Sequence, residues 1–140
     1  MKINETKIKV RYVETDQMGI VHHSNYFAWF EVGRTEFIKE QGLSYSEIEA
    51  RGVIIPLIEC GAQFKIGAKY EDELIIKTSM SLLTPVKMDM NYEIIRENDG
   101  KLLATGFTRH AFTSRELKPI NVKKKNPEVW AFFIEIENNI

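Results

Sequence analysis

Residues 12–26 read YVETDQMGIVHHSNY and connect a strand-like segment to a long apolar helix. Over residues 7–14, apolar and charged side chains alternate, which is the period of a strand with one buried face. Residues 16–19 then have the composition of a turn. We expect the helix to begin near Ser24 or Asn25, because either side chain can serve as the N-cap.

The helix that follows is apolar over most of its circumference, a pattern typical of a buried helix. Its large apolar residues are Tyr26, Phe27, Trp29, Phe30, Val32, Phe37 and Ile38. Gly42 is placed to end it. Ser44 and Glu47 have the spacing of a capping box, so a second, short helix is expected before Gly52.

Most of the remaining chain has strand character. We predict strands over residues 53–64, 74–83, 87–96 and 102–113. Pro56 favours an edge position or a bulge for the first of them, and the Asn-Asp-Gly sequence of residues 98–100 is a hairpin signal. Asn126 and Pro127 then open a final helix over about 127–137. The predicted fold class is therefore α+β, with one antiparallel sheet covering one long helix.

Composition excludes several classes of function. The chain has 140 residues, which fit a single domain over 1–140. A net charge of -1 gives no positive field for nucleic acid or an anionic membrane surface, and no apolar run reaches the length of about 18 residues typical of a membrane span. Cys60 has no second cysteine to pair with, and the N-terminus lacks the apolar segment of a secretory signal. We expect a cytoplasmic protein in which Cys60 is a small buried hydrophobic residue.

The turn and the helix start place a carboxylate opposite a helix N-terminus. Asp16 follows the first predicted strand, and the helix begins a short turn later. First-turn N–H groups lack intrahelical partners and carry the positive end of the helix dipole, so they can polarise an acyl carbonyl. An Asp facing that carbonyl can attack it or activate water. From the residues alone, a structural role for Asp16 in a common Asp-x-x-Gly turn is the more frequent case.

A family resemblance adds to this pattern. The run ETDQMGIVHHSNYFAWFEVGRTEF, residues 14–37, resembles the signature of the 4-hydroxybenzoyl-CoA thioesterase family, which includes the acyl-CoA thioesterases associated with the Tol–Pal gene cluster. The segments over residues 50–64, 68–78 and 115–119 are similar to segments at like places in that family. The resemblance implies a hot-dog fold, in which an antiparallel sheet wraps around a long central helix.

The same resemblance implies an activity and the residues that carry it. It implies an enzyme that hydrolyses an acyl-CoA thioester to a carboxylic acid and CoA, with Asp16 as nucleophile or general base. The backbone N–H of His23 would polarise the carbonyl. It also implies a homodimer or homotetramer with active sites at subunit interfaces. No cofactor is expected, since CoA is part of the substrate, and no metal site is expected, because adjacent His22 and His23 rarely bind one ion.

Three further residues are candidates for substrate binding. Tyr26 lies in the first helical turn and can contact substrate or belong to the core. Glu31 can reach the cavity, since a second clade of this fold uses a helix carboxylate at that offset, or it can pair with Arg34 at i+3. Some family members carry a basic triplet where this chain has residues 83–87. Here that region has only Lys87 to bind the CoA phosphates.

Three alternatives stay open at the level of the sequence. The acyl group can be carried by acyl carrier protein, an acidic partner that would seek a basic patch such as Lys65, Lys69 and Lys87. The protein can be a non-catalytic scaffold that binds acyl thioesters. A dehydratase of the same fold would pair His23 with Glu31, although the Asp16 turn belongs to the thioesterase pattern.

Overall fold

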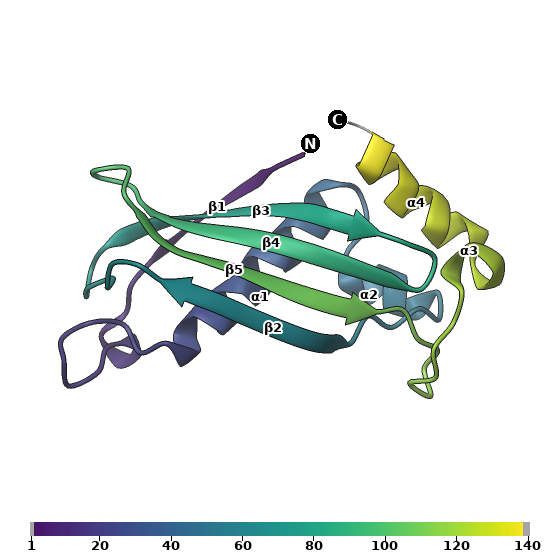
Figure 1. The fold of residues 1–140 in the computed structure, drawn as a ribbon. Coiled ribbons are helices and arrows are strands. Elements are labelled where there is room, and N and C mark those ends of the chain that lie inside the picture. Colours follow the sequence, from purple (N-terminus) through teal and green to yellow (C-terminus); the bar gives the residue numbers. More distant parts are fainter. Residues whose placement is uncertain (1, 139–140) are drawn as a thin grey trace.

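Residues 2–138, described by a computed structural model, form one antiparallel sheet lying across a long helix (Figure 1). The strands are β1 (Asn4–Lys9), β2 (Leu57–Phe64), β3 (Glu73–Leu83), β4 (Lys87–Arg96) and β5 (Leu102–Ala111). The helices are η1 (Tyr12–Glu14), α1 (Ser24–Glu40), α2 (Tyr45–Ala50), α3 (Val122–Lys125) and α4 (Pro127–Asn138). The strand order is β1-β3-β4-β5-β2, with every neighbouring pair antiparallel. The predicted domain bounds, 1–140, extend beyond the described residues at both ends.

Helix α1 packs against the inner face of the sheet, and the alternation of β4 shows why. The inward-facing residues of β4, which are buried against the helix, are Met88, Met90, Tyr92 and Ile94. The ring of Phe30 from α1 stacks on Tyr92, with centroids 4.5 Å apart. Gly106 on β5 makes this approach possible, because a Cβ there would clash with the Phe30 ring. The sheet therefore wraps around the helix, as the sequence predicted.

Several local signals in the sequence are confirmed. The capping box of α2 is present, with the Glu47 N–H donating to Ser44 Oγ at 3.1 Å. Asn126 caps α4, since its Oδ1 accepts from the Val129 N–H at 3.1 Å. Both caps depend on residues three positions apart, so the sequence alone suffices to predict them.

The first predicted strand is wrong in its second half. β1 ends at Lys9, and residues 12–14 form the turn η1 instead of continuing the strand. The carboxylate of Glu14 causes the change of direction, because it accepts from the Arg11 N–H at 2.7 Å and closes a turn there.

The predicted N-cap of α1 is also wrong. The N-cap is His23, which makes no side-chain capping hydrogen bond. Ser24 Oγ instead meets Nδ1 of His22 at 2.8 Å, and Asn25 Nδ2 donates to the Glu14 carbonyl at 2.9 Å. Both side chains thus fasten the helix start to the preceding loop.

Strand β2 forms one edge of the sheet and corrects the expectation for Cys60. That residue is exposed, because β2 has a neighbouring strand, β5, on one side only. Leu57, Ile58 and Phe64 on the same strand are 50%, 62% and 49% exposed. Pro56 stands just before this edge strand, where a missing N–H does no harm, as predicted. Among residues 2–138, no helix is long and apolar enough to cross a membrane.

Candidate active site

The loop between η1 and α1 contains a tight turn that begins at Asp16 and reverses the direction of the chain. The Asp16 N–H donates to the Ile20 carbonyl at 2.8 Å, and the Gly19 N–H donates to the Asp16 carbonyl at 3.0 Å. Gly19 closes the turn with a φ of +82°, in the left-handed region that favours glycine. The Met18 N–H donates to Asp16 Oδ1 at 2.8 Å, so one carboxylate oxygen is already oriented.

The start of α1 leaves one N–H of interest without a partner. The Asn25 and Tyr26 N–H groups donate to the carbonyls of His22 and His23, at 3.0 and 3.2 Å. The Ser24 N–H lies 3.3 Å from His22 Nδ1. Within the described chain, the His23 N–H donates no hydrogen bond. The expectation that first-turn N–H groups are free is thus not met at Ser24, Asn25 and Tyr26, and the N–H left free among residues 2–138 belongs to the N-cap residue His23.

One cavity of about 270 Å³ brings the loop and the helix start together. Its lining residues are Asp16, Met18, Ile20, Val21, His23, Tyr26, Phe64, Lys65, Ile66 and Gly67. Asp16, His23 and Lys65 therefore share an otherwise largely apolar hollow. This is the composition expected of a site that holds an apolar ligand and orients it with a few polar groups.

Tyr26 forms part of the apolar wall. It is 2% exposed, and its ring contacts those of Trp29 and Phe64, with centroids 4.8 and 5.0 Å away. Burial raises the pKa of Tyr26, so its hydroxyl stays neutral. Trp29 itself is buried in the core, as the sequence predicted.

Glu31 does not line this cavity within one chain. It is exposed on α1, eight residues after His23 and roughly 12 Å along the helix. Among the described residues it forms no ion pair with Arg34, which the i+3 spacing had favoured. Arg34 Nη1 instead donates to the Tyr92 hydroxyl at 3.2 Å, inside the sheet–helix interface.

Lys87 also lies away from the cavity. It begins β4 and pairs with Ala111, the last residue of β5, whereas Phe64 pairs with Ala104 near the other end of that strand. The separation along β5 is roughly 20 Å. Within one chain, Lys65 is the lysine that lines the cavity.

Glu14 is a residue of this region that the sequence did not single out. Its side chain is buried, at 4% exposure, and accepts from Trp29 Nε1 at 2.9 Å as well as from the Arg11 N–H. Burial acts to raise the pKa of Glu14, but these hydrogen bonds outweigh it and hold the pKa below its usual value. An acidic residue in a predicted strand normally faces solvent, so only the fold reveals this burial.

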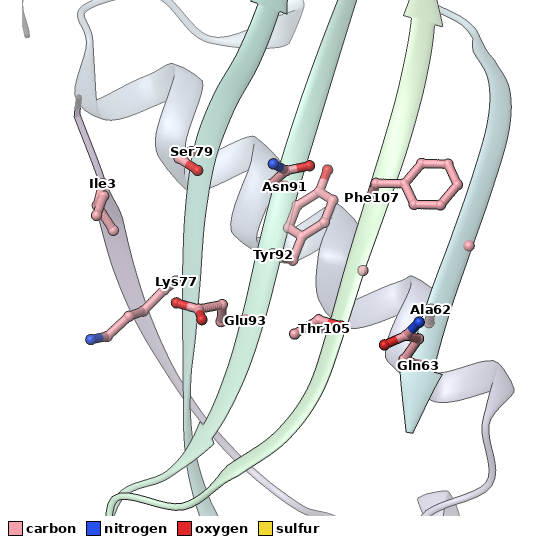
Figure 2. Close-up of a pocket in the computed structure, with 12 residues that line it drawn as sticks. Ile3, Ala62, Gln63, Lys77, Ser79, Asn91, Tyr92, Glu93, Thr105 and Phe107 are labelled. Carbon is pink, nitrogen blue, oxygen red and sulfur yellow. The ribbon is translucent and has the colours of Figure 1, made fainter. Parts of the chain in front are cut away.

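A larger hollow, of about 760 Å³, lies on the outer face of the sheet (Figure 2). It is lined by residues of β2, β3, β4 and β5, which include the polar cross-strand pairs Lys77–Glu93 and Ser79–Asn91 as well as the apolar Ala62 and Phe107. None of Asp16, His23 and Tyr26 reaches it. It also has no helix N-terminus among its walls, so the smaller cavity is the candidate active site. Within residues 2–138, no three His, Cys, Asp or Glu side chains are grouped as metal ligands.

Comparison with known proteins identifies the family. Residues 10–130 match the Thioesterase-like superfamily, and the chain belongs to that family. The hot-dog fold is therefore confirmed, as is the prediction of an enzyme at the level of the family.

Individual relatives are similar over most of the chain. The "Putative acyl-CoA thioesterase YneP" of Bacillus subtilis is 36% identical over 129 residues, covering 91% of this chain and 93% of that protein. A DHNA-CoA thioesterase from Staphylococcus aureus has a TM-score of 0.91 and 31% identity, covering 99% of this chain and 93% of that one. The acyl-CoA thioester hydrolase YbgC of Escherichia coli O157:H7 is 25% identical over 63% of this chain and 66% of that protein.

Proposed function

We propose that this protein hydrolyses an acyl-CoA thioester to a carboxylic acid and free CoA. The observation that carries the proposal is that Asp16 and His23 line one cavity, and that the His23 N–H donates no hydrogen bond within the described residues. The names of the relatives, which specify acyl-CoA and DHNA-CoA thioesters, support the substrate class. Placement in the 4-hydroxybenzoyl-CoA branch, with its Tol–Pal-associated members, is part of the proposal and is supported by the resemblance of residues 14–37 to the signature of that branch.

The His23 N–H stabilises the charge that develops on the carbonyl oxygen. The thioester carbonyl accepts a hydrogen bond from this N–H at the start of α1, where the helix dipole adds a partial positive charge. As the carbonyl carbon becomes tetrahedral, its oxygen gains negative charge and the hydrogen bond strengthens. Stabilisation that grows toward the transition state raises kcat and not merely affinity.

Asp16 serves the attack in one of two ways. As a general base, it takes a proton from water while the water oxygen bonds to the carbonyl carbon. The intermediate then collapses, the C–S bond breaks, and the CoA thiolate receives that proton. As a nucleophile, it forms an acyl–carboxylate anhydride as the C–S bond breaks and the CoA thiolate leaves. Water then hydrolyses the anhydride to the carboxylic acid and the Asp16 carboxylate, and the proton that this water gives up converts the thiolate to the thiol. Met18 fixes Oδ1 in either case, leaving Oδ2 for the chemistry.

The apolar walls receive the acyl group, and cations near the mouth receive the CoA phosphates. Phe64 provides exposed aromatic surface for an acyl chain or ring, and the buried Tyr26 ring packs beside it in the cavity wall. Lys65 is better placed than Lys87 to meet a phosphate within one chain, because it lines the cavity itself. Contributions of Glu31 and Lys87 to substrate binding then require a second subunit beside the cavity.

A second copy of the chain is proposed to lie against β2. This strand has an unpaired edge and exposed apolar side chains, Leu57 and Ile58 among them. Unpaired edges with apolar surface are normally covered. Phe64 belongs to both this edge strand and the cavity wall, so a partner there would complete the active site. The active form is a homodimer or a homotetramer built from it.

A thiol-release assay over short, long and aromatic acyl-CoAs tests the proposed function, with matched acyl groups on acyl carrier protein as a second series. Turnover of one acyl-CoA class is expected. Turnover of acyl groups on acyl carrier protein, with no turnover of acyl-CoAs, would identify acyl carrier protein as the carrier of the substrate. Binding of acyl-CoAs with no turnover of any of them would contradict hydrolysis and favour a non-catalytic scaffold.

A further inference from the structure

The Glu14 side chain connects two parts of the molecule that meet at the cavity. Its carboxylate accepts three donors: the Arg11 N–H at 2.7 Å, Trp29 Nε1 at 2.9 Å and Arg11 Nη2 at 3.4 Å. Arg11 lies on the β1 side of the catalytic loop, and Trp29 lies in α1, beyond the loop's other end. The carboxylate therefore ties the loop to the helix across fifteen residues of sequence.

The backbone carbonyl of the same residue makes a second connection. It accepts from the His22 N–H at 2.9 Å and from Asn25 Nδ2 at 2.9 Å. Asp16 follows Glu14 by two residues, and His23 directly follows His22. Both groups assigned to the reaction are thus attached, through one or two residues, to the atoms of Glu14.

We propose that Glu14 is a positioning residue, which sets the placement of the Asp16 carboxylate relative to the His23 N–H. This inference rests on the proposed function, because it concerns the geometry of that same site. The carboxylate acts through the loop and the helix and contacts no reacting atom. Reaction rates depend steeply on such placement, since an error of about 1 Å can lower turnover about a hundredfold.

The chemistry of the donors explains why a carboxylate is required. The Arg11 N–H and the Trp29 indole both donate, and an ionised carboxylate accepts with both oxygens. A Gln of the same shape can accept from only one of them, and its NH₂ group then faces the other donor. Such a buried mismatch is relieved when the side chain or one of the two segments moves.

The test compares Glu14→Gln, Trp29→Phe and the double variant, with Glu47→Gln as the matched control. Glu47 also accepts from a nearby backbone N–H, that of Ser44 at 3.3 Å, but it caps α2 away from the cavity. Turnover is measured on an acyl-CoA that the wild type accepts, together with the affinity for its non-hydrolysable thioether analogue. Circular dichroism and thermal unfolding identify any variant that fails to fold.

Glu14→Gln is expected to lower kcat by about tenfold to a hundredfold, with KM and analogue affinity within about threefold of wild type. Trp29→Phe removes the indole N–H, the donor that the NH₂ group of the introduced Gln would otherwise face. It should lower kcat less by itself, and the double variant should be no slower than Glu14→Gln. Glu47→Gln should turn over at the wild-type rate.

A wild-type kcat for Glu14→Gln would overturn the positioning role. The role would also be overturned if kcat of the double variant fell by the product of the factors measured for the two single variants. If Glu14→Gln does not fold, Trp29→Phe alone decides: a kcat loss at unchanged analogue affinity supports the role, and an unchanged kcat overturns it. Failure of the proposed function looks different, since the wild type itself would then turn over no acyl-CoA, whereas failure of the positioning role leaves the wild type and Glu14→Gln equally active.

Discussion

The carboxylate of Asp16 accepts a hydrogen bond from the backbone N–H of Met18 over 2.8 Å, so the turn itself orients the side chain on which the proposed reaction depends. Gly19 keeps this turn closed, since its N–H donates to the Asp16 carbonyl and its φ is +82°. The orientation of Asp16 is therefore linked to the backbone conformation three residues later.

Substitution of Gly19 by Ala should lower both stability and turnover. No atom lies within 4 Å of an added Cβ, so the effect comes from backbone strain in the left-handed region, which is worth about 1 kcal/mol. Gly100→Ala is the matched control, because Gly100 has a φ of +69° and the same open surroundings at the β4–β5 hairpin. Chemical denaturation should show similar losses for the two variants, and kcat should fall only for Gly19→Ala. Equal kcat values would mean that the turn does not orient Asp16.

The elements of the fold could be predicted because their signals are local. The capping box at Ser44 and Glu47 and the alternation of β4 need only neighbours along the chain. The exposure of Cys60 was not predicted, although Pro56 indicated an edge strand, because the covering of each face of β2 depends on how distant elements pack. Strand order is set by long-range pairing, which no single segment encodes.

The candidate site divides in the same way. Asp16 and His23 were found through a run of residues close together in the sequence, and the structure places both in one cavity. Phe64, the last residue of β2, was missed as a wall of that cavity, whereas Lys65 was named only as part of a basic patch for acyl carrier protein. Glu14 was missed because its partner, the Trp29 indole, lies a helix turn and a loop away.

Protonation of His110 should make stability depend on pH. The ring is 1% exposed, and Nε2 meets Thr108 Oγ1 at 2.8 Å, which in turn meets the Tyr92 hydroxyl at 2.6 Å. Burial, with the nearby positive charge of Arg34, lowers the pKa of His110 to about 4. The unfolded chain binds a proton near pH 6.5 and the folded chain does not, so the stability present above that pH is lost progressively as the pH falls toward 4.

The expected loss between those pH values is roughly 3 kcal/mol from this residue. Denaturation curves at half-unit pH steps measure it, with His110→Asn as the comparison. The variant should be less stable at neutral pH but should have a flatter profile between pH 4 and 6.5. A wild-type profile with no slope over that range would contradict a buried, neutral His110.

Disruption of the β2 edge should separate the subunits and remove activity together. Ile58→Asp places a charge on an edge side chain that is 62% exposed in the single chain. Sedimentation should then show a species of 16.3 kDa with little turnover, whereas the wild type should sediment as a dimer or larger. Val86→Asp, at a 50% exposed position between β3 and β4, is the control and should keep the wild-type assembly. A fully active monomer would show that the second subunit does not contribute to the active site.

Glu31→Gln should lower kcat less than Asp16→Asn does. Glu31 is exposed and does not line the cavity of its own chain, so any contribution comes from across a subunit interface. Parallel steady-state measurements on one substrate give the ranking. The reverse ranking would place the principal carboxylate on the helix and change the mechanism.

The most direct test of the account is the single-turnover rate of Asp16→Asn on an acyl-CoA that the wild type hydrolyses. The amide is nearly isosteric, and its oxygen can still accept from the Met18 N–H, so the turn and the thermal stability should be kept. It is a poor base and a poor nucleophile, so the rate should fall by about a hundredfold or more, with the affinity for a thioether analogue unchanged. A rate within about threefold of wild type, a difference below about 1 kcal/mol in barrier, would contradict the assignment of Asp16 to the reaction.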